Sequence, residues 1–239
     1  VLTTGPFADQ LIEQTKAARF AALEVTLVPN DIHDRTNYIY SLYLAREHLN
    51  DDLLMLHGDL VFNSGVLGRL LADPRPDLGL VNAALPQPEK DFKARVIDGV
   101  IREVSVEIAD PDCHAFQPLY KLSRRAVGVW LDRVVRFVEQ GDTGVYAELS
   151  PQTSVEMNAE NALNEVTRDA AIGVFSYEGE SVNEVDTLAD LAAVSSEIRL
   201  FDFTEQPILA QPDDYRRLPQ LLRSVGAARP LVVGGGTYE

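Results

Sequence analysis

Apolar and polar residues along the first 80 positions follow a strand–helix–strand order. One apolar run, at 53–56, is continuous, which is typical of a strand buried on both faces of a parallel sheet, and a further strand is expected at 78–81. Elsewhere, apolar residues recur at helical spacing. The pattern predicts strands at 1–4 and 25–29 and helices at 8–20, 38–49 and 64–71. Such alternation predicts a doubly wound α/β sheet.

The pattern changes after residue 90. Asp98-Gly99 between two β-prone runs predicts a hairpin over 94–108. The segment 143–165 is polar and predicts no clear element. The remaining expected elements are strands at 116–122, 172–177, 182–185 and 231–233, and helices at 126–139, 188–198 and 215–225. Composition shifts near residue 199, so we expect one domain over 1–198 and the opening of a second α/β domain over 199–239.

Composition narrows the class of protein. The net charge is −16 and 46% of the residues are hydrophobic. That charge argues against general nucleic-acid binding, which needs Lys and Arg, but a metal could still hold a nucleotide. With one cysteine, Cys113, no disulfide framework can form. No run is long enough for a membrane span and no signal peptide is visible. We expect a cytoplasmic protein with neither nucleic acid nor membrane as partner, and a homo-oligomer stays open. Val1 is no initiator Met, and we expect both ends to be cut from a longer protein.

Asp59 is the first candidate for chemistry. It follows the buried run 53–56 in Leu56-His57-Gly58-Asp59. Ligands of open α/β sheets bind at the carboxyl ends of strands, where a carboxylate can hold Mg²⁺. An Asp that caps the next turn is the alternative, and the spacing alone leaves both open.

Glu184 and Asp186 form the second candidate. On an extended strand they point to the same face. Asp186 also precedes Thr187 and a helical run, and by position alone the helix-cap interpretation is favoured.

Three segments together resemble one family. They are Thr36-Asn37-Tyr38-Ile39-Tyr40-Ser41-Leu42-Tyr43-Leu44-Ala45, Leu56-His57-Gly58-Asp59-Leu60-Val61-Phe62 and Glu184-Val185-Asp186-Thr187-Leu188-Ala189-Asp190-Leu191. In this order, over residues 1–198, they resemble the sugar-nucleotide and phosphocholine-type nucleotidyltransferases. The resemblance implies a Rossmann-like (GT-A-like) mixed sheet flanked by helices.

The resemblance also implies a reaction. Asp59 and Asp186 would hold a catalytic Mg²⁺, with Glu184 as a helper. A small phosphate or phosphonate acceptor would attack the α-phosphorus of a nucleoside triphosphate, CTP ahead of the others, and release pyrophosphate. One element of the family, an N-terminal strand with a Gly-rich loop, has no counterpart at the start of this chain. We therefore expect this chain by itself to have little transferase activity.

Further residues are weaker candidates. Asn37 could contact substrate, or cap a helix. Lys93 belongs to a local basic cluster that could grip a phosphate, or lie on a solvated hairpin. Tyr146 and Glu148 resemble an acceptor-site segment of the phosphocholine-type relatives. His57 shares a strand face with Asp59 and could line the site, although a structural histidine is the favoured interpretation.

Residues 201–239 resemble the opening of iron-containing alcohol dehydrogenases. The resemblance rests on 203–208, 215–222 and 230–236, the last ending in Gly234-Gly235-Gly236. NAD(P) and Fe²⁺ would concern only the missing remainder of such a domain. Two alternatives to the transferase stay open: a GT-A glycosyltransferase, and a non-catalytic nucleotide-binding module of a dehydrogenase.

Overall fold

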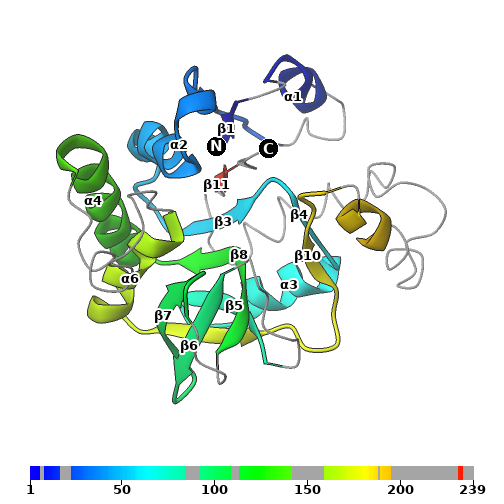
Figure 1. Ribbon diagram of the computed structural model, residues 1–239, viewed down its shortest axis with the longest axis vertical. Helices are drawn as coiled ribbons and strands as arrows, with labels where there is room; N and C mark the ends of the chain where they lie inside the picture. Colours follow the sequence, from blue (N-terminus) through cyan, green and yellow to red (C-terminus); the bar gives the residue numbers. More distant parts are fainter. Residues whose placement is uncertain are drawn as a thin grey trace.

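A mixed nine-stranded sheet forms the centre of the molecule in a computed structural model of the chain (Figure 1). The structure describes residues 1–5, 8–16, 23–83, 92–108, 113–141, 159–187, 189–194 and 231–233. The strand order is β2 (Leu27–Pro29), β1 (Leu2–Thr4), β11 (Leu231–Val233), β3 (Leu53–His57), β8 (His114–Leu122), β5 (Leu78–Asn82), β9 (Ile172–Ser176), β7 (Val100–Ser105) and β6 (Lys93–Ile97). Strands β2, β1, β11 and β3 are parallel, and β8 runs antiparallel between β3 and β5. The predicted mixed α/β sheet is confirmed.

Helices cover both faces of this sheet (Figure 1). Helices α2 (Tyr38–Ala45), α4 (Arg124–Gln140) and α6 (Ala159–Asp169) pack together on one face, and α3 (Ser64–Ala72) packs on the other. Other helical elements are α1 (Ala8–Thr15), η2 (His33–Arg35) and η3 (Arg46–His48). The result is a three-layer arrangement in which the central strands are buried on both sides.

Two apolar clusters hold the layers together. On the face of α2, α4 and α6, Leu42 and Trp130 are fully buried, and Ala162 of α6 joins them. On the face of α3, Leu70 packs with Leu80 of β5. The continuous apolar runs of β3 and β5 supply side chains to both clusters, which explains their lack of alternation.

Several predicted boundaries were wrong. The helix expected over 38–49 is α-helical only to Ala45 and then continues as the 3-10 turn η3. The strand expected to reach residue 108 ends at Ser105. The polar segment that predicted no element contains the start of α6. The hairpin is confirmed: Asp98 and Gly99 both have positive φ, 52° and 73°, as a two-residue turn with right-handed strand twist requires.

A second, two-stranded sheet lies beyond the end of β3. Strand β4 (Leu60–Phe62) pairs antiparallel with β10 (Val182–Glu184), and Glu184 lies opposite Leu60. The Val185 N–H also donates to the Asp59 carbonyl oxygen at 3.1 Å. This small sheet joins two segments that are more than a hundred residues apart in the chain.

Candidate functional site

The candidate site lies at the carboxyl end of β3. His57 is the last residue of that strand, Gly58 turns the chain, and Asp59 directly precedes β4. Because β10 pairs with β4, Glu184 is brought beside them, and ligand atoms of His57, Asp59 and Glu184 all lie within 4.8 Å of one another. The strand end predicted from the sequence therefore gathers one imidazole and two carboxylates.

A buried carboxylate, Glu160 of α6, contacts the His57 ring of this group. Its side chain is 0% exposed, and one of its oxygens lies 3.0 Å from His57 Nε2. The Tyr120 hydroxyl donates to the same oxygen at 2.7 Å, and the Tyr38 hydroxyl donates to the other. The ring N–H of His57 is not well aligned with the carboxylate, so we describe this contact as an ion pair. The other ring nitrogen, Nδ1, lies 3.6 Å from Glu184 Oε1.

The electrostatics of the cluster follow from burial and from this pairing. Burial alone would lower the pKa of His57, but Glu160 and Glu184 outweigh it and raise that pKa to about 10. Burial alone would raise the pKa of Glu160, but His57 and the two tyrosine hydroxyls bring it below its usual value. In the absence of a cation, the pair is therefore a buried imidazolium against a carboxylate.

Asp59 is the carboxylate of this group whose negative charge is least stabilised by its surroundings. Burial raises its pKa, the charges of Asp186 and Glu160 raise it further, and His57 opposes them. Its Oδ1 is buried and has no hydrogen-bond partner among the residues that the structure describes. A buried oxygen of this kind normally needs a partner, and a divalent cation would provide one.

Asp186 lies exposed two residues after Glu184. Its charge acts on Asp59, so the two carboxylates are near each other, but it does not belong to the group of three ligand atoms. It is also not the helix cap. Thr187 and Asp190 cap the helical residues 189–194 reciprocally: Asp190 Oδ2 accepts from the Thr187 N–H at 2.8 Å, and Thr187 Oγ1 accepts from the Asp190 N–H at 3.2 Å.

The other predicted site residues lie apart from this group or outside the described residues. Asn37 caps α2, and its side chain accepts from the Ile39 N–H at 3.3 Å. Lys93 is buried in β6, and its ammonium donates to the Val106 carbonyl oxygen at 2.6 Å. The predicted acceptor-site residues Tyr146 and Glu148 lie outside the described residues.

Sequence reasoning missed three residues of the cluster: Tyr38, Tyr120 and Glu160. In Thr36-Asn37-Tyr38 the prediction was placed on Asn37, yet its neighbour Tyr38 reaches Glu160. Glu160 lay in a segment without a predicted element. Its signal was the helical spacing of Ala162, Leu163 and Val166, which places α6 against the sheet.

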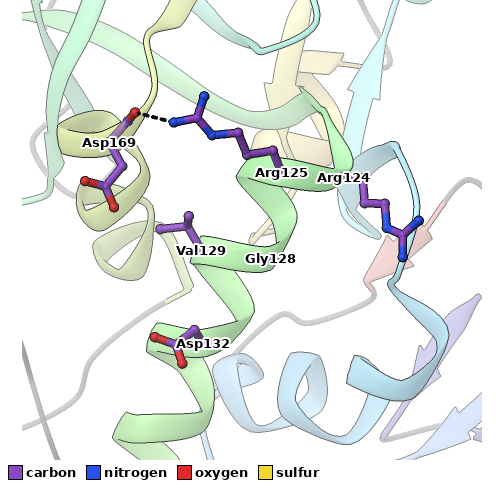
Figure 2. A pocket seen from close by; sticks show the side chains of 6 residues that line it. All are labelled: Arg124, Arg125, Gly128, Val129, Asp132 and Asp169. Atoms are coloured by element: carbon purple, nitrogen blue, oxygen red, sulfur yellow. Dashed lines mark hydrogen bonds between the residues drawn. The ribbon is translucent and has the colours of Figure 1, made fainter.

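The structure has an open hollow elsewhere, between the start of α4 and the end of α6 (Figure 2). There Arg125 donates to the Asp169 carbonyl oxygen at 3.2 Å. The neighbouring Arg124 N–H donates to Asp52, which directly precedes β3. This hollow therefore lies near the amino end of β3, whereas His57 lies at its carboxyl end. The hollow and the His57 group are therefore separate features of the molecule.

Known proteins share the fold. No family model matches the chain. The inositol-1-phosphate CTP transferase of T. maritima is 15% identical with a TM-score of 0.61, and the match covers 87% of this chain and 78% of that one. The CTP:phosphocholine cytidylyltransferase of Streptococcus pneumoniae is 15% identical with a TM-score of 0.62, covering 83% and 78%. The chain thus has the fold of the nucleotidyltransferases.

A known protein is also similar to part of this chain in sequence. The CMP-5'-(3-aminopropyl)phosphonate synthase of Streptomyces rubellomurinus is 35% identical over 107 residues. This match covers 43% of the chain and only 16% of that protein, so the chain corresponds to a small part of its relative.

Proposed function

We propose that the chain is a metal-dependent nucleotidyltransferase that uses CTP and couples CMP to a small phosphate or phosphonate. One observation carries the proposal: β4–β10 pairing places Glu184 beside Asp59 at the carboxyl end of β3, where Asp59 keeps a buried oxygen without a hydrogen-bond partner in the described part of the chain. Strand ends of open α/β sheets are where such folds bind ligands.

The choice of CTP and of the acceptor class is supported by the sequence relative, whose name describes a CMP-phosphonate product. The two structural neighbours are named for CTP and for phosphorylated alcohols. At 15% identity they support the fold and leave the acceptor to experiment.

The reaction needs alignment and charge neutralisation more than a nucleophile on the protein. An acceptor oxygen forms a bond to the α-phosphorus, the α–β phosphoanhydride bond breaks, and pyrophosphate leaves with the electron pair. Asp59 and Glu184, with Asp186 nearby, would hold a Mg²⁺ that neutralises phosphate charge. The protein's own contribution is to fix these carboxylates: the small sheet sets their separation.

The test is pyrophosphate release by the full-length protein with Mg²⁺, each of the four nucleoside triphosphates and a panel of small phosphates and phosphonates. We expect release with CTP and one acceptor class. Asp59→Asn should lower the rate at least about 100-fold, since each electrostatic contact to a developing charge contributes on that scale. Asp98→Asn, a matched change at the exposed hairpin turn, should leave the rate unchanged.

Comparison of Glu184→Gln with Asp186→Asn then decides which acid is the partner of Asp59. A glycosyltransferase would release no pyrophosphate from any triphosphate, and a binding module would tolerate Asp59→Asn. Either result, with a folded protein, would overturn the proposal.

We also propose, from the resemblance of residues 201–239, that the chain leads into a dehydrogenase-like domain. Residues 231–233 pair within the nine-stranded sheet, and 195–230 lie outside the described residues. Production of residues 1–198 alone tests the division. A cooperative unfolding transition equal to that of the whole chain would support it, whereas loss of the transition would assign the last strand to the first domain.

A further inference from the structure

The two nitrogens of His57 face different groups. Nε2 lies 3.0 Å from Glu160, and Nδ1 lies 3.6 Å from Glu184. Since Glu184 and Asp59 belong to the same compact group, Nδ1 is the nitrogen that faces the acids. A lone pair on Nδ1 would therefore point toward the space where a cation would be held.

The ring has little freedom to turn away. Its side chain is 6% exposed, and the Tyr38 ring packs edge-on against it with 4.9 Å between ring centroids. Glu160 is itself fixed by hydrogen bonds from Tyr38 and Tyr120. A carboxylate beside the remote nitrogen is what usually orients a metal-binding histidine.

We infer that His57 Nδ1 is a third metal ligand beside Asp59 and Glu184, and that Glu160 is the residue that positions its ring. This inference rests on the proposed function for the purpose of the cation, but the geometry that carries it is the cluster itself. Asp59 contributes the second indication, a buried oxygen that no described residue satisfies.

The mixed donor set has a chemical consequence. Mg²⁺ prefers oxygen ligands, whereas imidazole suits first-row transition metals, and Mn²⁺ accepts both. A site of one imidazole and two carboxylates should therefore bind Mn²⁺ more tightly than Mg²⁺. Replacement of His57 should reduce that difference, because it removes the one nitrogen donor.

The test is Mn²⁺ binding to the metal-free protein without nucleotide. Pulsed EPR should show nitrogen modulation from a directly bound imidazole, and titration calorimetry should give the Mn²⁺ and Mg²⁺ affinities. In His57→Gln we expect the modulation to vanish and Mn²⁺ affinity to fall at least about tenfold. His48→Gln, at an exposed histidine of η3, should change neither.

Glu160→Gln tests the positioning role. Loss of an outer carboxylate typically lowers metal affinity about 10–100-fold, so Mn²⁺ should bind more weakly while the nitrogen modulation persists. A purely structural role would leave the Mn²⁺ affinity of the folded variant unchanged.

The wild-type spectrum is decisive even if a variant fails to fold. Bound Mn²⁺ without nitrogen modulation would overturn the inference, as would an unchanged Mn²⁺ affinity in His57→Gln. Neither result would refute the proposed nucleotidyl transfer, because that reaction needs only the carboxylates and the pyrophosphate assay tests it separately.

Discussion

Glu160→Gln should measure how much the buried cluster contributes to stability. The change keeps the shape of the side chain and one oxygen acceptor but removes the charge that faces His57 at 3.0 Å. Removing one partner of a buried ion pair costs about 3–5 kcal/mol. The Tyr38 and Tyr120 hydroxyls can still donate to the amide oxygen, each such bond being worth about 0.5–1.5 kcal/mol, so part of the network survives. The two retained bonds together offset about 1–3 kcal/mol of that cost, so we expect a net loss of about 2 kcal/mol.

Urea unfolding of the metal-free protein, with a chelator present, is the assay, because a bound cation would add stability of its own. The same loss should lower the melting temperature by about 2–4 °C per kcal/mol for a chain of this size. Glu139→Gln is the matched control, since Glu139 also accepts a hydrogen bond from a tyrosine, Tyr43, but at the exposed surface. We expect it to cost well under about 0.5 kcal/mol. A loss for Glu160→Gln as small as the control's would refute the view that this ion pair stabilises the fold.

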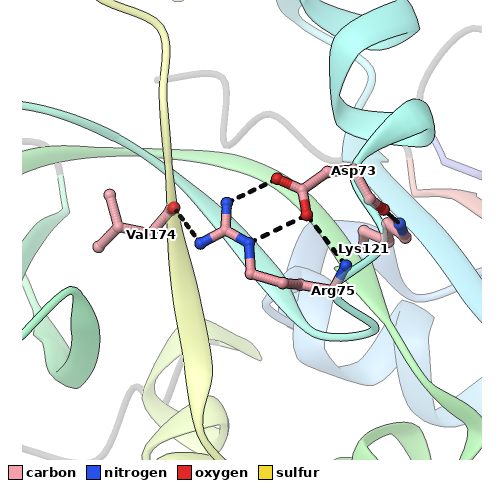
Figure 3. Close-up of polar contacts among 4 residues, drawn as sticks. All are labelled: Asp73, Arg75, Lys121 and Val174. Atoms are coloured by element: carbon pink, nitrogen blue, oxygen red, sulfur yellow. Dashed lines mark hydrogen bonds and ion pairs between the residues drawn. The ribbon is translucent and has the colours of Figure 1, made fainter.

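Two further predictions concern the packing around Gly79 in β5 and the ion pair of Asp73 at the surface. Gly79→Ala should lower the free energy of unfolding in urea by about 1–3 kcal/mol, because an added Cβ would lie 2.9 Å from side chains of both β7 and β8. Gly128→Ala, in α4, is the control: its Cβ would meet nothing within 4 Å, so this change should stabilise the protein by about 0.5–1 kcal/mol. Equal changes in stability for the two variants would refute the view that Gly79 has no room for a side chain. At the surface, hydrogen bonds from Arg75 lower the pKa of Asp73 to about 2 (Figure 3). A lowered folded-state pKa gives stability that is present above about pH 4 and lost as pH falls toward 2. Solvent screening limits this to no more than about 1 kcal/mol, so Asp73→Asn should flatten the stability profile slightly between about pH 4 and 2. An unchanged profile would contradict the pairing.

The sequence predicted the elements that carry a strong local signal, such as an apolar run or a turn-specific pair of residues, and it missed those set by long-range pairing. The continuous apolar run of β3 predicted a buried strand, the apolar residues of β5 predicted a further strand, and Asp98-Gly99 predicted its hairpin. Strand β4 has only three residues and forms because β10 pairs with it, which no local pattern reveals.

The candidate site divides in the same way. Asp59 was a candidate from the sequence because it lies two residues after the end of a recognisable strand. Glu160 was not, since charged side chains are rarely fully buried and its three partners, two hydroxyl donors and one imidazole, come from α2, β8 and β3. Only the tertiary structure brings those partners together.

The position of β11 also bears on how the chain folds. Strands β1 and β3 both pair with β11, which is inserted in parallel between them, rather than with each other. The contacts that complete the centre of the sheet thus join residues 2–3 and 55–57 to residues 231–233. Pairings between residues so far apart in the sequence raise the contact order of the protein and slow its folding. During synthesis, a chain that has not yet reached β11 would carry two unpaired inner edges. Such edges recruit strands from other chains, so aggregation of residues 1–198 on their own is the result by which this topology would refute the domain division proposed above.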